Sequence, residues 1–534
     1  MESLGEETWD VVISGTGLSQ SLLALALSRS NKRIIHLDKN DFYGEHDAAL
    51  SLQEADAWAQ TYASGGAAQQ LDQSRSSTND TDEPVAGPSG AANVDNSATT
   101  ATPPSKEGSS IFRNAHVWKH SDAEAKGLSF PRAYSLALAP QIIHTRSELL
   151  SQLVSSKAYR QVEFLAVRPS FFLYCTTDTL ASMLVRIPSS REDVFSARNI
   201  PPRSKRRLMA FLKFVIDYDS DEQKPVWQEK ANKPLSEFLV DEFKFDNEDL
   251  RDSILALTLT LDEKITVEDG LARIHRHISS MGLFGRGFCA VYPKWGGVSE
   301  IAQVGCRAGA VGGGIYMLDT EASISEQGNG SETTLNLSNK ASIKTTAVVS
   351  SQQTCSAESY TIARLVAIIN SPLNSLFDHL GDHPKPAVTV IVFSMDPPIY
   401  AFVHSSDTGE CPEGQSVIYL TMKATPQSSE ALDGALECVL QAMEMIPDEP
   451  EADILYKLYY EQGTSAREPV VKSQGSATVF EFPSPSVGLA FDDTSLDAVK
   501  EAWKIVMRNE VPDDEFMKFE NREGMGDDDD DVSD

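Results

Sequence analysis

Hydrophobic residues near the start of the chain predict a strand, a helix and a second strand in close succession. Residues 11–13 form a short apolar run before Gly15, and residues 20–28 are apolar around the whole helical circumference. An all-round apolar helix is typical of a crossover buried against a sheet. Residues 33–37, RIIHL, form a second largely apolar run that ends at Asp38. This pattern predicts a parallel βαβ unit.

The turn between the first strand and the helix carries part of a dinucleotide-binding fingerprint. In the pattern G-x-G-x-x-G, Gly15 permits the tight turn and Gly17 lets the backbone approach a pyrophosphate. Asp38, at the end of the second strand, is placed to bind a ribose hydroxyl. The third glycine is replaced by Gln20, whose side chain intrudes where the phosphates belong. The sequence therefore predicts a dinucleotide fold more firmly than a dinucleotide site.

Helical periodicity dominates the middle of the chain. One face of the helix predicted over residues 205–218 carries Leu208, Phe211, Leu212, Val215 and Ile216. Three further helices are predicted at 234–243, 246–261 and 266–281, and together they indicate a small helical domain inserted into a larger one. From periodicity alone, their apolar faces are better explained as plain core than as a lipid pocket.

Strands and short helices alternate in the rest of the chain, which predicts an α/β fold. Strands are predicted at 132–139, 162–167, 171–176, 344–350, 359–369, 387–393 and 416–423, and helices at 145–155 and 429–445. The strands at 162–167 and 171–176 are expected to form a hairpin around Arg168. The segment 282–318 is dense in glycine and aromatic residues, which implies close backbone approach.

One stretch has the composition of a disordered segment. Residues 64–110 are mostly Ser, Thr, Ala, Gly, Pro, Asn and Asp, which cannot offset the entropy of ordering. We expect a large domain in three parts, a disordered insertion, a helical domain and a solvated acidic tail. The parts of the large domain are 1–58, 112–192 and 282–510, the insertion is 59–111, the helical domain is 193–281 and the tail is 511–534.

The charge balance limits the classes of partner. Lys and Arg total 46 against 78 Asp and Glu, a formal net charge of −32. So acidic a chain disfavours nucleic acid or an anionic membrane as the main partner. The first residues do not resemble a secretory signal, and no apolar run approaches the roughly 20 residues of a bilayer span. We expect a cytosolic protein with reduced cysteines, since its six cysteines form no C-x-x-C motif.

No catalytic or metal-binding motif occurs in the sequence. The zinc motif H-E-x-x-H, the P-loop and the nucleophile elbow G-x-S-x-G are all missing. His275 and His277 lie two positions apart on a predicted helix, on different faces, which argues against joint ligation of a metal. Cys289 and Cys306 have no evident His–acid pair. We therefore expect no catalytic residue, no metal and no bound cofactor.

Five segments, taken together and in order, resemble one known superfamily. They are GTGLSQSLLALALS, HLDKNDFYG, RAYSLALAPQIIHTRSELLSQL, KRRLMAFLKFVIDYD and YPKWGGVSEIAQVGCRAGAVGGGIYML. The superfamily comprises the Rab escort proteins and the Rab GDP-dissociation inhibitors. The resemblance implies a FAD/NAD(P)-binding-like large domain, built like the flavin-dependent monooxygenases, with an inserted helical domain. It also implies that no flavin is bound, which fits Gln20.

In this superfamily a platform on the large domain grips the switch regions of a GDP-bound Rab GTPase. The resemblance assigns that role to Tyr43, Glu300, Arg307 and Met317, which we call the platform residues. Charged groups and apolar area of this kind suit a protein interface. Without the resemblance, an internal ion pair and two core side chains would be the simpler interpretation.

Two residues depart from the family pattern beside the platform. Glu45 stands where a second glycine is usual, and Ile315 stands where a polar residue is common. These departures affect the fine detail of the Rab contact rather than the platform itself.

The resemblance also assigns the Rab tail and its lipid. The apolar patch for the tail falls within 139–153, where Ile142, Ile143 and Leu149 are the candidates. The geranylgeranyl chain would enter the helical domain, where each buried methylene is worth about 0.8 kcal/mol.

Three features favour an escort protein over an inhibitor: the disordered insertion, the segment IPSSREDVFSARNI and the block FCAVYPKWGG. Such a protein binds GDP-bound Rabs, presents them to the Rab geranylgeranyltransferase heterodimer and delivers them to membranes, without catalysis of its own. The first alternative is a Rab GDP-dissociation inhibitor. The second is a flavin-dependent oxidoreductase, which Asp38 and the two glycines favour and Gln20 opposes. The third is an interaction scaffold that keeps only the fold.

Overall fold

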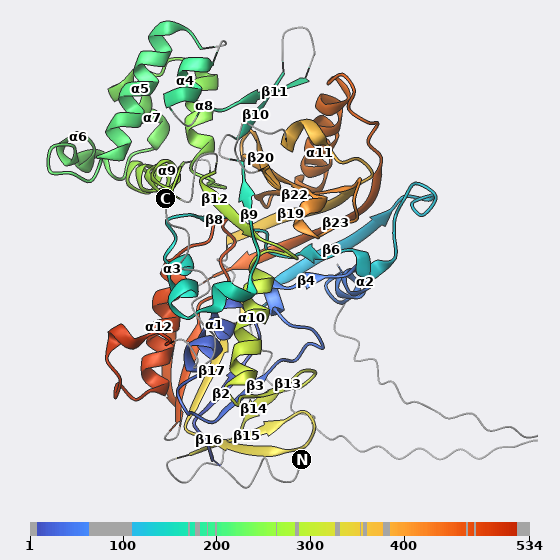
Figure 1. Cartoon of the computed structure of the whole chain (residues 1–534), viewed down its shortest axis with the longest axis vertical. Coiled ribbons are helices and arrows are strands. Elements are labelled where there is room, and N and C mark those ends of the chain that lie inside the picture. Colours follow the sequence, from blue (N-terminus) through green and yellow to red (C-terminus); the bar gives the residue numbers. More distant parts are fainter. Residues whose placement is uncertain are drawn as a thin grey trace, which may run out of the picture.

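The computed structural model describes residues 8–520 except for 64–108, 169–170, 177–181, 189–190, 198–199, 263, 284–287, 326–331, 353, 356–359, 378–384, 466–467 and 475–476. The predicted insertion lies outside the described residues except at its two ends, and so does the acidic run after residue 520. Figure 1 shows a sheet with α1 and α10 beside it, a larger sheet next to it and a group of helices at the far end.

The first predicted unit is present. β2 (Val11–Ser14), α1 (Leu18–Leu27) and β3 (Ile34–Leu37) form a parallel βαβ unit, which confirms the prediction from the apolar pattern. Their sheet has the order β13–β3–β2–β17–β25–β24. The other members are β13 (Ile315–Met317), β17 (Ala347–Ser351), β25 (Ala477–Phe482) and β24 (Val470–Gln474), of which only β24 is antiparallel to its neighbour in the described part of the sheet.

Different layers cover the two faces of this sheet. On one face, α1, α10 (Val298–Val311) and α12 (Thr494–Val506) share a core with Val11 and Ile13. On the other face, a smaller sheet packs against Val12. It consists of β1 (Thr8–Trp9), β16 (Ser342–Thr345), β15 (Thr333–Leu337) and β14 (Ala322–Ile324). Successive side chains of a strand point to opposite faces, so β2 contributes to both cores.

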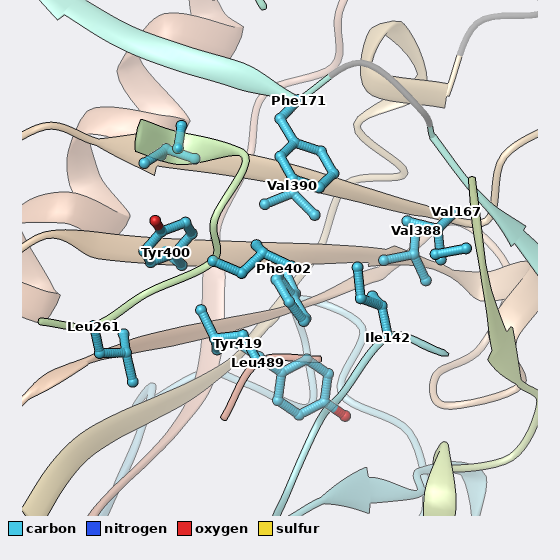
Figure 2. Close-up of a cluster of buried hydrophobic side chains, with 14 of the residues drawn as sticks. Ile142, Val167, Phe171, Leu261, Val388, Val390, Tyr400, Phe402, Tyr419 and Leu489 are labelled. Atoms are coloured by element: carbon cyan, nitrogen blue, oxygen red, sulfur yellow. The ribbon is translucent and has the colours of Figure 1, made fainter. Parts of the chain in front are cut away.

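The larger sheet is mixed. Its order is β6 (Phe112–Lys119), β23 (Ile454–Thr464), β19 (Tyr360–Ile369), β22 (Ser416–Lys423), β21 (Ile399–Ser405), β20 (Val388–Phe393), β9 (Phe164–Val167), β12 (Ala290–Pro293) and β8 (Ile143–His144). One face is covered by α11 (Ser428–Glu444). The other face carries the buried cluster of Figure 2, which includes Val390 and Phe402 of the sheet together with Ile142.

Short elements connect these layers. They are β4 (Ala49–Leu50), α2 (Leu52–Thr61), β5 (Ser109–Ser110), β7 (Leu136–Ala137), α3 (Glu148–Ser155) and β18 (Thr354–Cys355). Helix α2 begins with a capping box, in which Ser51 and Glu54 satisfy each other's backbone N–H groups. None of the described helices combines the length and the hydropathy of a bilayer span.

The predicted helices of the inserted region are present. They are α5 (Pro202–Ile216), α7 (Leu235–Phe243), α8 (Glu248–Ala256) and α9 (Val267–Ser279), accompanied by the short α4 (Arg191–Ser196) and α6 (Lys224–Trp227), which the pattern did not predict. Figure 1 shows them gathered at one end of the molecule. The predicted face of α5 is buried except for Ile216, which lies at the helix end and is exposed.

The predicted hairpin between residues 162–167 and 171–176 is wrong. Both β9 and β10 (Phe172–Thr176) run parallel to β20, where Val167 pairs with Val388 and Phe172 with Ile391. β10 forms its hairpin with β11 (Ser182–Arg186) instead. The buried Arg168 donates from Nη1 to the carbonyl oxygen of Leu376, at 2.8 Å. β9 and β10 therefore run in the same direction and do not pair with each other as a hairpin.

Three other expectations also differ from the structure. The predicted strand at 132–139 is reduced to β7, which follows a 3-10 turn at Pro131–Ala133. The predicted strand at 344–350 is divided between β16 and β17, which belong to different sheets. Phe516 and Met517 are buried in the core around α12, so packing continues past the expected boundary at residue 510.

Helices α1 and α10 approach each other closely because glycines line their contact. A Cβ atom on Gly305 would lie 2.5 Å from the carbonyl oxygen of Ser21, closer than any carbon side chain tolerates. A Cβ atom on Gly312 would meet the carbonyl oxygen of Ser28 in the same way. The two backbones are therefore in contact along α10.

Replacing Gly305 by alanine should separate these two helices. We expect Gly305→Ala to lower the free energy of unfolding by about 1–3 kcal/mol, because an added methyl group overpacks the contact. The matched control is Gly434→Ala on α11, where a Cβ atom would meet open space. It should stabilise the protein by about 0.5–1 kcal/mol through helix propensity. Urea unfolding measures both, and an unchanged Gly305→Ala variant would contradict the close contact.

Candidate functional site

The platform residues are positioned mainly by α10. The segment before it reverses direction through Trp295, Gly296 and Gly297, all with positive φ. The first turn of the helix then carries Glu300, where a negative charge is favourable to the helix dipole. Arg307 follows seven residues later and lies two turns along the same face.

Glu300 and Arg307 do not form the internal ion pair that the residues alone suggest. Among the described residues the pair is not within ion-pair distance, although Arg307 is near enough to lower the pKa of Glu300. Burial has the larger effect and raises that pKa above its usual value. Arg307 is exposed, and its Nη1 donates to Gln161 Oε1 at 3.5 Å, the limit of a hydrogen bond. Both charged groups therefore remain available to a partner.

Tyr43 lies beside α10. Its side chain is 36% exposed, and its ring centroid is 6.4 Å from that of Tyr316 on β13. Burial raises the pKa of Tyr43, and the neighbouring Cys306 of α10 and Asp38 raise it further. Tyr43 is thus a surface side chain beside α10 and not a core residue.

Met317 has a different position from the other platform residues. Tyr316 faces α10, since its hydroxyl is close to Gly309. The adjacent Met317 therefore points to the opposite face of β13, where it packs half-buried against the core of the smaller sheet. Tyr43 thus lies near Cys306 of α10, Glu300 and Arg307 lie two turns apart on the same helix, and Met317 lies on the far face of β13.

The three candidates for the Rab tail are core residues in this structure. Ile142, Ile143 and Leu149 are each 0% exposed. Ile142 lies in the cluster of Figure 2, while Ile143 and Leu149 pack in the core with α1 and α10. An apolar run looks the same in a sequence whether it forms a surface patch or a core. In this conformation none of the three side chains offers a surface to a peptide.

The space above the first glycine of the fingerprint is filled by protein. A Cβ atom on Gly15 would lie 2.6 Å from Glu45 Oε2 and 2.7 Å from Gln20 Nε2. Gln20 is itself buried, and its Nε2 donates to Ser351 Oγ at 2.5 Å. Side chains therefore occupy the place that a pyrophosphate takes in a dinucleotide-binding protein.

The hydrogen-bonding groups of the fingerprint are also in use. The backbone N–H of Leu18, at the start of α1, donates to Asp47 Oδ2 at 2.8 Å. Asp38 Oδ2 accepts from the backbone N–H and the hydroxyl of Thr16, at 2.8 and 2.5 Å, and Asp38 Oδ1 accepts from Asn40. Protein groups thus satisfy both the helix N-terminus and the acid that would bind a ribose. The residues present do not fit a flavin or nicotinamide dinucleotide.

The roles of Thr16, Glu45 and Asp47 in this arrangement were not predicted from the sequence. Their contacts join residues 22 to 29 positions apart, such as Thr16 with Asp38 and Leu18 with Asp47. The departure from the family pattern at Glu45 was the one available signal. Within the described part of the chain, no three His, Cys, Asp or Glu side chains are grouped to hold a metal ion.

His46 supplies a positive charge between the carboxylates of Glu45 and Asp47. Its Nε2 lies 3.1 Å from Asp47 Oδ2, and its Nδ1 lies 3.7 Å from Glu45 Oε2. Burial alone would lower the pKa of His46, but the two carboxylates raise it to about 9. Burial would raise the pKa of Asp47, yet His46 and the Leu18 N–H hold it below its usual value. The phosphate site is therefore replaced by an internal ion cluster.

This cluster makes stability depend on pH. A folded pKa near 9, above the unfolded value of about 6.5, means that the contribution is complete below pH 6.5 and lost as pH rises through 9. Between pH 6.5 and pH 9, we expect the free energy of unfolding of the wild type to fall by up to about 3 kcal/mol more than that of His46→Gln. Urea unfolding at several pH values measures this difference. His116→Gln, a change at an exposed histidine of β6, is the control, and identical pH profiles for wild type and His46→Gln would contradict the cluster.

Comparison with known proteins finds a matching family model and curated relatives. Residues 5–81 and 107–427 match the family model described as GDP dissociation inhibitor. The chain is 27% identical over 454 residues to "Rab proteins geranylgeranyltransferase component A" of Saccharomyces cerevisiae, covering 81% of this chain and 65% of that protein. It is 25% identical over 523 residues to the protein of the same name from Drosophila melanogaster, covering 96% of this chain and 90% of that protein.

The match covers less than two thirds of the length of the first two relatives. The chain spans 65% of the length of the Saccharomyces cerevisiae protein and 62% of the length of its Candida albicans counterpart. Among solved structures, a Rab GDI from Plasmodium falciparum superposes with a TM-score of 0.60 at 16% identity, over 95% of this chain and 99% of that one. This likeness shows the fold. Because the family model matches most of its length, the chain belongs to the GDP dissociation inhibitor family.

Proposed function

We propose that the chain is a Rab escort protein. It binds GDP-bound Rab GTPases, presents them to the Rab geranylgeranyltransferase heterodimer and keeps the attached lipid covered until membrane delivery. The protein performs no bond chemistry itself. The observation that carries the proposal is that Glu300 and Arg307 lie two turns apart on one face of α10, with charges that the fold does not consume. The relatives named as transferase component A support the escort branch.

The Rab surface is bound by Tyr43, Glu300 and Arg307, with Met317 at the edge. The exposed Val311 and Ile315 extend this surface with apolar area. Val311 lies one turn after Arg307 on α10, so an apolar side chain adjoins the guanidinium. A charged centre beside apolar area is typical of a specific protein interface.

The geranylgeranyl chain enters the helical domain. Its core is rich in aromatic rings: Phe211 lies 5.1 Å from Phe243 and 5.8 Å from Phe245, measured between ring centroids. Phe214 lies 5.2 Å from Phe243 as well. The rings fill the space between α5 and α7, so a lipid must separate these helices to enter. Twenty carbons then replace contacts between aromatic rings, at about 0.8 kcal/mol for each buried methylene.

The transferase docks on α4 and α5 of the helical domain. Phe195 on α4 is 72% exposed, and its carbonyl oxygen accepts from Lys205 Nζ at 2.9 Å. Arg203, Arg206 and Lys213 are exposed and share one face of α5. A basic stripe beside an exposed phenylalanine stands out on a chain of net charge −32. It suits a partner with an acidic surface and an apolar pocket.

The second candidate function is that of a Rab GDP-dissociation inhibitor. A guanosine nucleotide diphosphate dissociation inhibitor of Arabidopsis thaliana is 21% identical over 332 residues, and the solved Rab GDI shares the fold. Both functions use the platform. Only the escort function requires the contact with the transferase.

Removing the guanidinium of Arg307 should weaken Rab binding. We expect Arg307→Ala to lose about 1–3 kcal/mol of affinity for a GDP-bound Rab, because a charged hydrogen bond is lost at a desolvated contact. The free energy of unfolding should stay within about 0.5 kcal/mol of wild type, since the side chain is exposed. Titration with a fluorescent Rab measures affinity, with Arg508→Ala, an exposed arginine after α12, as the matched control. Equal affinity for both variants would remove Arg307 from the site.

Removing the side chain of Phe195 should impair the contact with the transferase but not the binding of the Rab. We expect Phe195→Ala to bind GDP-bound Rab like wild type, because α4 does not contribute to the platform. Lipid transfer to that Rab should fall by about tenfold or more, since an exposed aromatic anchor is lost. Met445→Ala, a change at another exposed apolar side chain, is the control. Full transfer activity of Phe195→Ala would place the transferase contact elsewhere.

A further inference from the structure

We infer that the remnant of the dinucleotide-binding turn, made of Thr16, Asp38 and Asp47, is a positioning device for Tyr43. These residues hold the segment 43–47 in place and thereby set the distance between Tyr43 and α10. The inference rests on the proposed function, because Tyr43 is the Rab-binding residue that this segment carries. None of the three touches the surface on which the Rab would lie, since all are buried.

The first anchor is the hydroxyl of Thr16. It accepts a hydrogen bond from the backbone N–H of Gly44 at 2.9 Å and donates its own hydrogen to Asp38 Oδ2 at 2.5 Å. A hydroxyl group can do both at once. The carboxylate of Asp38 is held in turn by the backbone N–H groups of Thr16 and Asn40. The residue directly after Tyr43 is therefore fixed to the end of β2.

The second anchor is the carboxylate of Asp47 on the N-terminus of α1. It accepts from Leu18 N–H, where the helix dipole favours a negative charge, and it lies beside His46. The backbone N–H of Asp47 also donates to the carbonyl oxygen of Gly44 at 2.8 Å, which closes a short turn. The turn needs Gly44, whose φ is 101° and where a Cβ atom would lie 2.7 Å from Ala48 Cα. Both ends of the segment are thus tied to the old phosphate site.

A third contact, with the ring of Tyr316, supports the ring of Tyr43. Tyr316 lies between Tyr43 and His36, with its ring centroid 4.7 Å from that of His36. The Nε2 atom of His36 is 2.6 Å from the carbonyl oxygen of Gly15, so this stack also ends on the fingerprint turn. The backbone N–H of Asp38 donates to the carbonyl oxygen of Met317 at 3.0 Å. The residues of the fingerprint therefore also hold β13, the strand that carries Tyr316.

The same helix also fixes the other half of the Rab surface. α1 contacts α10 through Gly305, so Glu300 and Arg307 are held by the body of α1 while Tyr43 is held by its N-terminus. A loss of either anchor would leave α10 in place and free Tyr43. Binding that needs both halves in register should then weaken, without loss of the fold.

The test removes only the hydroxyl of Thr16. Thr16→Val keeps the shape of the side chain and Thr16→Ser keeps the hydroxyl, and each is made in the full chain with Tyr43 and with Tyr43→Ala. We expect Thr16→Val to weaken the affinity for a GDP-bound Rab by about fivefold to tenfold when Tyr43 is present. In the Tyr43→Ala background the loss should be less than about twofold, because the anchor then has nothing to position. Thr16→Ser should bind like wild type. Equal losses in both backgrounds, or no loss in either, would overturn the inference.

A second measurement needs no Rab. Hydrogen exchange of a peptide that spans residues 41–48 should quicken in Thr16→Val, because the Gly44 amide loses its acceptor, and should remain slow in Thr16→Ser. Exchange in β17 is the internal control. Unchanged exchange of residues 41–48 in Thr16→Val would overturn the anchor even if Rab binding changed. If wild type bound no Rab but the exchange result held, the proposed function would fail while the anchor stood.

Discussion

The contact between α1 and α10 is the constraint on which the rest of the structure depends. It is a contact between backbones, because the carbonyl oxygen of Ser21 leaves no room for a side chain at Gly305. In a dinucleotide-binding protein the N-terminus of such a helix faces a pyrophosphate. In this chain it faces Asp47, and His46 balances the charge. A helix that positions a cofactor in dinucleotide-binding proteins thus holds two parts of the proposed Rab-binding surface in this chain.

Local patterns predicted much of the fold, whereas long-range pairing escaped them. The unit β2–α1–β3 and the helices α5, α7 and α9 follow from apolar periodicity, which lies within each segment. The strands β21 and β23 and the route of β9 and β10 depend on partners far along the chain, such as Phe172 with Ile391. The buried Glu410 makes the same point, because it accepts hydrogen bonds from Tyr292 and Tyr419 and pairs with His404. No spacing rule brings such residues together.

The site shows the same division. Gln20 indicated that the phosphate end of the dinucleotide fingerprint is altered, because the position of the third glycine is fixed by the motif. The filling of that site by Glu45 and Asp47 was not predictable, since their roles arise only when the segment folds back over α1. The apolar residues Ile142, Ile143 and Leu149 were assigned to a surface patch, and they lie in the core. Periodicity records which residues avoid water, but it does not distinguish a core from a groove.

The proposed function joins a Rab-binding platform to a helical domain with a packed aromatic core and an exposed basic stripe. Its central claim is that the chain presents Rabs for lipid attachment. The most direct measurement is the incorporation of geranylgeranyl into a GDP-bound Rab by its transferase, with and without this protein. We expect incorporation of the lipid to depend on the presence of this protein. Incorporation at the same rate without it, together with tight binding of the already prenylated Rab, would contradict the escort role and favour an inhibitor.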